Sequence, residues 1–401
     1  MRIMTMNNLL IGLLLTLFLV PILVSVHNYS YYVNNTAAYL QLALCVFLFI
    51  KHQLYKELSN KKINRGMWGY LLVLLMIFGG WLYQYIPFQG LYRSWVYLSS
   101  IVLYLILLAV AQRDPLFLST FIRTKQLVIF SVGIFFILFI YFFAEPEMIY
   151  SLKAHPPVFR HLRHLNYEIF FGVLIATLCI ISNKYRTEQT AMLFVLVFLT
   201  AWSGGRGSVL GVLVSLAFLW FFLSATNRKQ LMFRLLSLSV VSLIIILLTN
   251  RDAILANTLG YSTEYDLDRF SSGRILIWYE AISVVWNEGV IAILTGLGPD
   301  AFGRWGLYRL IIQPHNAFVQ CFMEFGLLGL VVFIFFITKT VINAVHLLKN
   351  SDDQLMQVIA VSFIGGMAFS LVDGIFYHAY PLLMMIFLSA TINAQATAIR
   401  I

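Results

Sequence analysis

Long runs of apolar residues, separated by short polar segments, fill most of this sequence and limit what it can fold into. Hydrophobic residues make up 61% of the 401 residues and charged residues 11%, whereas a soluble domain has about 25% charged residues. At about 20 residues per span, the chain is long enough to cross a bilayer about a dozen times. The sequence predicts an all-α, polytopic membrane protein that forms one integral membrane domain over residues 1–401, with spans near 9–26, 36–50, 67–84, 94–111, 127–143, 167–182, 190–202, 207–223, 231–248, 316–337, 355–372 and 380–396.

Basic residues between the predicted spans set the expected orientation. The segment from Lys51 to Arg65 is the densest basic loop, and basic residues in short loops collect on the cytoplasmic side. With that loop inside, twelve alternating spans place both termini in the cytoplasm. Of the 27 basic residues, ten then fall on the outer side, and all of them except Lys153 are arginine: Arg93, Arg160, Arg163, Arg206, Arg251, Arg269, Arg274, Arg304 and Arg309.

This preference for arginine indicates an anion site on the outer side. A guanidinium group is a planar fork that can hold two phosphate oxygens, whereas the lysine ammonium group is a point charge. The net charge of +10 then reflects anionic lipids on the inner side and an anionic substrate on the outer side. Nucleic acid is not an expected partner.

The longest segment outside the predicted spans is a large outer loop, residues 249–315, with a helical pattern of its own. Ser271 or Ser272 could cap a helix that starts at Gly273 or Arg274. Arg274 would then lie in the first turn, where free backbone N–H groups favour an anion. A simple contact with lipid headgroups is the alternative for this arginine. The expected apolar stripe of the helix consists of Ile275, Trp278, Ile282 and Val285.

Arg206 has a similar setting in the polar break Ser203–Ser208, directly before a predicted span. Gly204, Gly205 and Gly207 carry no side chains that would keep a phosphate away from the backbone. A plain tight turn is the alternative explanation for this segment.

Pro314 and His315 precede another predicted span. Proline suits a helix start, so we expect His315 at the outer mouth of that helix. Gly326 lies 11 residues later, which at about 100° per residue returns to the same face, where it could admit a neighbouring helix. Glu324 would lie on the opposite face, so we expect a polar residue satisfied within the bundle. Near a helix start and arginines, a neutral His315 could accept a proton; an interfacial histidine is the alternative.

Taken together, these motifs resemble those of a known family. They are Ser203–Ser208, Ser272-Gly273-Arg274 followed by Ile277-Trp278, and His315-Asn316 with Gln320, Glu324 and Gly326-Leu327-Leu328-Gly329; the segment Arg160–Asn166 is similar to an arginine- or asparagine-bearing loop of several members. Their order resembles the O-antigen ligase and O-antigen polymerase superfamily of bacterial inner membranes.

The resemblance implies a multi-pass inner-membrane glycosyltransferase of lipopolysaccharide biosynthesis whose active site is periplasmic. It would transfer glycan from an undecaprenyl-pyrophosphate carrier to lipid A-core or another glycan acceptor, with no metal and no cofactor. Arg206 and Arg274 are the expected pyrophosphate clamp and His315 the expected base, so that a single displacement would invert the anomeric centre. The weaker candidates for substrate contacts are Arg160, Arg163, Arg269, Arg309 and Asn316.

Several alternatives remain open at this point. The polymerases and the protein O-oligosaccharyltransferases of the same family share these motifs, although the ligase branch is favoured. The pair Asp266 and Asp268 could instead bridge a metal to the pyrophosphate. A flippase or transporter of lipid-linked glycan belongs to a different class of protein. It would bury charged residues along a pathway within its spans, where this sequence has few.

The orientation can be tested with reporter fusions. We expect fusions after Lys62, Lys125 and Lys349 to report from the cytoplasm and fusions within 255–310 to report from the periplasm, because of the asymmetry of basic residues. Alkaline phosphatase and a fluorescent protein are the complementary reporters. A cytoplasmic signal from 255–310 would contradict the orientation and remove the basis for a periplasmic arginine site.

Overall fold

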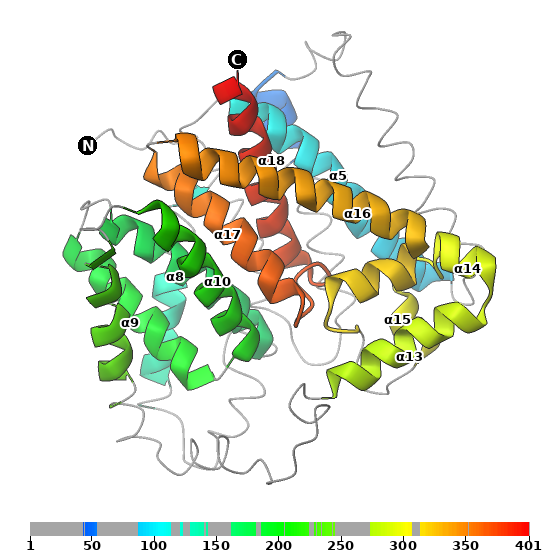
Figure 1. The fold of residues 1–401 in the computed structure, drawn as a ribbon, viewed down its shortest axis with the longest axis horizontal. Coiled ribbons are helices and arrows are strands. Elements are labelled where there is room, and N and C mark those ends of the chain that lie inside the picture. Colours follow the sequence, from blue (N-terminus) through cyan, green and yellow to red (C-terminus); the bar gives the residue numbers. More distant parts are fainter. Residues whose placement is uncertain are drawn as a thin grey trace. The chain divides into compact units, whose positions relative to one another are not determined.

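The computed structural model is mainly helical over its described residues and contains no strand there, which confirms the all-α prediction for them (Figure 1). Its labelled helices are α5 (Pro87–Arg113), α8 (Leu162–Ile181), α9 (Arg186–Ser203), α10 (Arg206–Phe222), α13 (Arg274–Asn287), α14 (Val290–Thr295), α15 (Ala301–Trp305), α16 (Ala317–Asn350), α17 (Gln354–Ser370) and α18 (Ala379–Arg400). Apart from isolated positions, the described residues are 45–53, 87–113, 129–139, 162–181, 186–203, 205–223, most of 231–242, 273–306, 313–351 and 353–400.

Two described helices are long and apolar enough to cross a membrane by length and composition: Arg93–Gln112 within α5, and α16. Shorter apolar helices occupy several other predicted spans, including Arg206–Phe222 and Gln354–Ser370. The predicted spans 9–26 and 67–84 lie outside the described residues. The count of twelve spans, the position of the termini and the single domain stay predictions.

The described helices fall into two compact units. One unit contains α8, α9, α10 and α17, and small residues permit its closest helix contact. A Cβ atom added at Gly365 of α17 would lie 2.4 Å from the carbonyl oxygen of Gly211 in α10. At the same crossing, the Ser215 hydroxyl donates to the carbonyl of Val361 at 2.9 Å. Close approach at small residues is a common way for apolar helices to associate in lipid.

The other unit contains α5, α13, α14, α15, the first part of α16, and α18. Its long helices are joined by buried polar side chains as well as by apolar packing. The Asn343 amide of α16 donates to Asn393 of α18 at 2.7 Å, and Asn393 donates to the Tyr104 hydroxyl of α5 at 3.1 Å. Such bonds between helices fix which faces meet.

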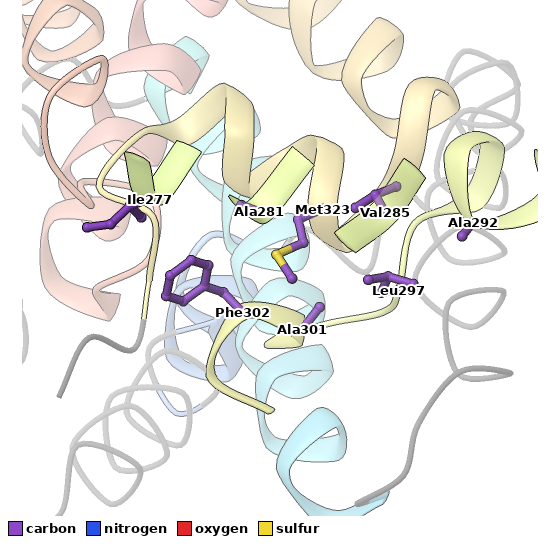
Figure 2. Packing of buried hydrophobic residues seen from close by; sticks show 8 residues of the cluster. All are labelled: Ile277, Ala281, Val285, Ala292, Leu297, Ala301, Phe302 and Met323. Atoms are coloured by element: carbon purple, nitrogen blue, oxygen red, sulfur yellow. The ribbon is translucent and has the colours of Figure 1, made fainter. Parts of the chain in front are cut away.

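Three short helices, α13, α14 and α15, occupy the predicted large loop 249–315, as expected. They pack on the first turns of α16 through a hydrophobic cluster (Figure 2), which consists of Ile277, Ala281, Val285, Ala292, Leu297, Ala301, Phe302 and Met323. The side of the membrane on which these helices lie stays a prediction.

The details of α13 correct two expectations. The helix does begin at Arg274, but its N-cap is Gly273, with a left-handed φ of 77° and no side-chain capping bond. Ile275 and Ile282, expected on the buried stripe, are exposed. Val285 is buried as expected and Trp278 packs against the cluster, but the other core-facing positions are Ile277 and Ala281.

Helix α16 breaks at Gly326, which has a φ of 65° and a ψ of −164°. The expectation that His315 and Gly326 share one helical stripe is therefore wrong, since His315 precedes the helix and Gly326 itself is not helical. The break admits a chain segment rather than a helix: Leu297 N–H donates to the carbonyl of Met323 at 2.8 Å, and Gly298 N–H to that of Glu324 at 3.0 Å.

A comparison of two glycines tests how strongly the fold depends on this break. A Cβ at Gly326 would lie 2.4 Å from the Leu294 carbonyl carbon, whereas a Cβ at Gly306, with a φ of 61°, meets nothing within 4 Å. We expect Gly326→Ala to lower the free energy of unfolding by about 3 kcal/mol or more, from backbone strain plus overpacking. Gly306→Ala should cost only about 1 kcal/mol, from its left-handed backbone. Thermal unfolding of the purified protein measures both, and equal losses would contradict this account of Gly326.

Candidate functional site

His315 lies just before the start of α16 and not on it. The side chain of Asn316 caps the helix, because its Oδ1 accepts hydrogen bonds from the N–H groups of Phe318 at 2.9 Å and Val319 at 3.2 Å. His315 itself has a left-handed φ of 55° and is only 3% exposed. A non-glycine residue in this conformation carries strain that the surrounding structure must hold in place, and such strain is frequent at functional sites.

The carboxylate of Asp373 faces the His315 ring. Its Oδ1 lies 3.5 Å from Nδ1 of His315, and both side chains are buried. The sequence analysis did not single out Asp373, because no helical spacing connects two residues so far apart in the chain. One signal was available, since Asp373 is the only acidic residue between Gln354 and Arg400.

This arrangement gives the two ring nitrogens of His315 different roles. A carboxylate beside Nδ1 favours the tautomer that carries a proton there, which leaves Nε2 as the proton acceptor. The same carboxylate stabilises the positive ring that forms after the proton is taken up. A separation of 3.5 Å is long for a hydrogen bond, but catalytic contacts are often long before substrate binds.

Several contacts hold the two segments around this pair together; we call residues 313–316 the histidine segment and residues 371–378 the aspartate segment. The Asn316 amide donates to the carbonyl of Leu371 at 3.1 Å. Gln313 Nε2 lies 3.2 Å from Nε2 of His378, and its side chain fills the space where a Cβ at Gly374 would stand. The pairing of His315 with Asp373 is thus flanked on both sides.

Helix α13 supports the histidine segment from another direction. The Trp278 indole N–H donates to the carbonyl of Pro314 at 2.8 Å. Arg274 is the first residue of α13, four positions before Trp278, and residues four apart lie on the same face of a helix. Arg274 and His315 therefore lie in the same compact unit, in two segments that this hydrogen bond joins.

Arg206 belongs to the other compact unit, where it is the exposed first residue of α10. A Cβ at Gly205 would lie 2.5 Å from the Asn166 amide nitrogen of α8. The glycine thus makes room for the Asn166 side chain. Arg163, half-buried in the first turn of α8, lies three residues before Asn166.

The roles expected for several other side chains stay predictions. Arg160, Arg269 and Arg309, together with the pair Asp266 and Asp268, lie outside the described residues. Within the described residues, no group of three His, Cys, Asp or Glu side chains could hold a metal ion. Both the oxygen and the nitrogen of the Asn316 amide form hydrogen bonds within the protein. Its contact with substrate therefore stays a prediction.

Glu324 is buried, and its two carboxylate oxygens accept hydrogen bonds from the Tyr97 hydroxyl and from Gln320 Nε2. The expectation that it is a satisfied polar residue of the helix bundle is confirmed. These contacts belong to a larger cluster around Arg93, which the sequence analysis placed only in the outer group of arginines.

Comparison with known family models finds a similarity over part of the chain. A family model described as O-antigen ligase matches residues 191–334, a segment that includes Arg206, Arg274, His315 and the break at Gly326. A search of curated proteins finds no match. The family consists of membrane proteins that act as glycosyltransferase-like ligases and polymerases in polysaccharide biosynthesis. Over residues 191–334 the chain is similar to the O-antigen ligase family, which supports the resemblance of its motifs.

Proposed function

We propose that the protein is an O-antigen ligase that moves glycan from an undecaprenyl-pyrophosphate carrier to lipid A-core. The reaction takes place at the periplasmic face of the bacterial inner membrane. The observation that carries this proposal is the buried pair of His315 and Asp373. His315 lies directly before the start of α16. A histidine held by a carboxylate is a suitable general base for an acceptor hydroxyl.

The proposed reaction is a single displacement at the anomeric carbon of the carrier-linked sugar. The acceptor hydroxyl oxygen forms a bond to C1 while the bond from C1 to the pyrophosphate oxygen breaks, and undecaprenyl pyrophosphate leaves. The hydroxyl proton passes to Nε2 of His315. Attack from the side opposite the leaving group inverts the configuration at C1.

Asp373 supports this step without touching the substrate. Its carboxylate orients the imidazole ring and stabilises the positive charge that the ring acquires. Burial strengthens this interaction, because a carboxylate and an imidazolium attract each other more strongly where water is excluded.

The leaving group gains negative charge as the bond breaks, and arginines stabilise it. Arg274 and Arg206 are each the first residue of a helix, where backbone N–H groups without helical partners also favour an anion. Groups that are held in place before the reaction stabilise the transition state without having to reorganise. Arg160, Arg163, Arg269 and Arg309 are further candidates for phosphate or acceptor contacts.

A polymerase of the same family would use the same chemistry with a different acceptor, the end of another carrier-linked glycan. The lipopolysaccharide of a deletion strain distinguishes the two activities. Loss of all polymer-bearing lipid A-core supports the ligase, whereas a band with a single repeat supports the polymerase.

The base can be tested by substitution. His315→Ala should abolish transfer but retain binding of the lipid-linked donor, because the arginines hold that donor. Asp373→Asn should lower the transfer rate by about 10-fold or more, because the ring loses the carboxylate that orients it and stabilises its positive form. His346→Ala is the matched control, since that histidine contacts Asn350 within α16, and it should leave transfer unchanged. The measurement is transfer by purified protein from lipid-linked donor to acceptor; a His315→Ala variant that keeps a tenth of the wild-type rate would overturn the assignment.

The clamp can be tested with lysine, which keeps the charge but loses the two-pronged geometry. Arg206→Lys and Arg274→Lys should each lower the transfer rate about 10²–10³-fold, the effect of losing one preorganised donor, with expression near that of the wild type. Near-normal transfer by both variants would make these arginines headgroup anchors or turn residues. EDTA should leave the wild-type rate unchanged; a loss that Mg²⁺ or Mn²⁺ restores would favour the metal-bridged alternative at Asp266 and Asp268.

A further inference from the structure

Arg93 is buried in α5, within the apolar stretch Arg93–Gln112, and only 4% of its surface is exposed. A buried guanidinium group loses its hydration, and the protein must replace it with other contacts. The partners that Arg93 has therefore indicate what the residue is used for.

Those partners lie on the aspartate segment. The guanidinium nitrogens donate to the carbonyl oxygens of Phe376, at 3.2 Å, and of Tyr377. The guanidinium carbon also lies 4.2 Å from the centroid of the Tyr377 ring. On its other side it lies 4.6 Å from the centroid of the Tyr97 ring. Arg93 thus holds the backbone of two neighbouring residues and a side chain of the same turn.

Both tyrosine rings are themselves fixed at their hydroxyl ends. Tyr377 donates to Asp300 at 2.9 Å, just before α15. Tyr97 donates to Glu324 of α16 and accepts a hydrogen bond from Gln320 at 3.1 Å. The guanidinium group is therefore held between two anchored rings, and its position follows from α15 and α16 rather than from its own flexible side chain.

A tight turn connects the held carbonyls to Asp373. Gly374 N–H donates to Oδ1 of Asp373 at 2.7 Å, and the N–H groups of Tyr377 and His378 both donate to the Gly374 carbonyl, at 3.0 and 3.2 Å. This turn transmits the position of residues 376 and 377 to the carboxylate that faces His315.

We propose that Arg93 is a positioning residue for glycan transfer: by holding the turn at Phe376 and Tyr377, it keeps Asp373 in place against His315. This inference rests on the proposed function of the His315–Asp373 pair. Two features of arginine are needed, the fork that reaches two carbonyls and the flat face that stacks on two rings. Lysine provides neither of them.

The structural half of the proposal can be measured without any activity. Hydrogen–deuterium exchange of the full-length protein should be about 10-fold faster in the peptide covering 371–378 of Arg93→Lys, because a loosened turn opens more often. Exchange elsewhere should match that of the wild type. Arg228→Lys is the matched control, because Arg228 also stacks on a ring, Trp220, and also donates to a backbone carbonyl, that of Leu223. Unchanged exchange over 371–378, or faster exchange throughout the protein, would overturn the proposal.

The functional half needs a double-mutant cycle in the transfer assay. Arg93→Lys alone should lower kcat about 10-fold or more and leave KM for the lipid-linked donor within about 3-fold, as expected for a misplaced partner of the base. In the Asp373→Asn background it should lower the rate by no more than about 2-fold, because the two residues act through one contact. A double variant whose loss of rate equals the product of the two single losses would overturn the proposal, as would a normal kcat for Arg93→Lys.

The proposed glycan transfer and the proposed role of Arg93 can fail independently. If the wild type transfers no glycan from the lipid-linked donor, the proposed function fails, while the exchange experiment still decides whether Arg93 holds the turn. If Arg93→Lys does not fold, Tyr377→Phe takes its place, since it keeps the ring but loses the bond to Asp300. That variant should also speed exchange over 371–378 and slow transfer, and wild-type behaviour in both would overturn the proposal.

Discussion

The contact between His315 and Asp373 depends on two non-helical segments being held against each other at the ends of long helices. Each segment would fray if it were left to itself, because neither has the internal hydrogen bonds of a helix. Side chains supply the missing bonds instead: Asn316 reaches the carbonyl of Leu371, and Gln313 reaches His378. The strained backbone of His315 is stable only within that frame.

In the compact unit that contains α5, α13, α14, α15, the first part of α16, and α18, glycines allow the remaining chain to pack around these segments. The left-handed Gly273 starts α13, and Gly326 interrupts α16 so that the chain at Leu297 and Gly298 can bond to its backbone. The hydrophobic cluster of α13, α14 and α15 then packs on the first turns of α16. As a result, Trp278 reaches Pro314 and Arg274 stands at the same end of the unit as His315. Arginine and histidine are thus placed by apolar packing as much as by their own polar contacts.

Buried charge has a similar structural use. Arg93 and Glu324 lie in apolar helices, and each is surrounded by tyrosine, glutamine or backbone partners rather than by water. In a membrane protein such residues often mark a transport pathway. Here Arg93 bonds to the turn that carries Asp373, and Glu324 is linked to Arg93 through the Tyr97 ring.

The sequence by itself predicted the helical class, the resemblance to the O-antigen ligase family and three candidate functional residues, Arg206, Arg274 and His315. These follow from composition, from helix starts and from motifs that are local in the chain. Only the tertiary structure decided that Asp373 faces the histidine and that Arg93 bonds to the turn that carries Asp373, because these residues come from segments far apart in sequence and no periodicity connects them. It also decided the role of Gly326 and the buried face of α13, since both depend on where the loop folds back. Local pattern fixes which residues begin a helix, whereas the partners of a side chain depend on packing between distant segments.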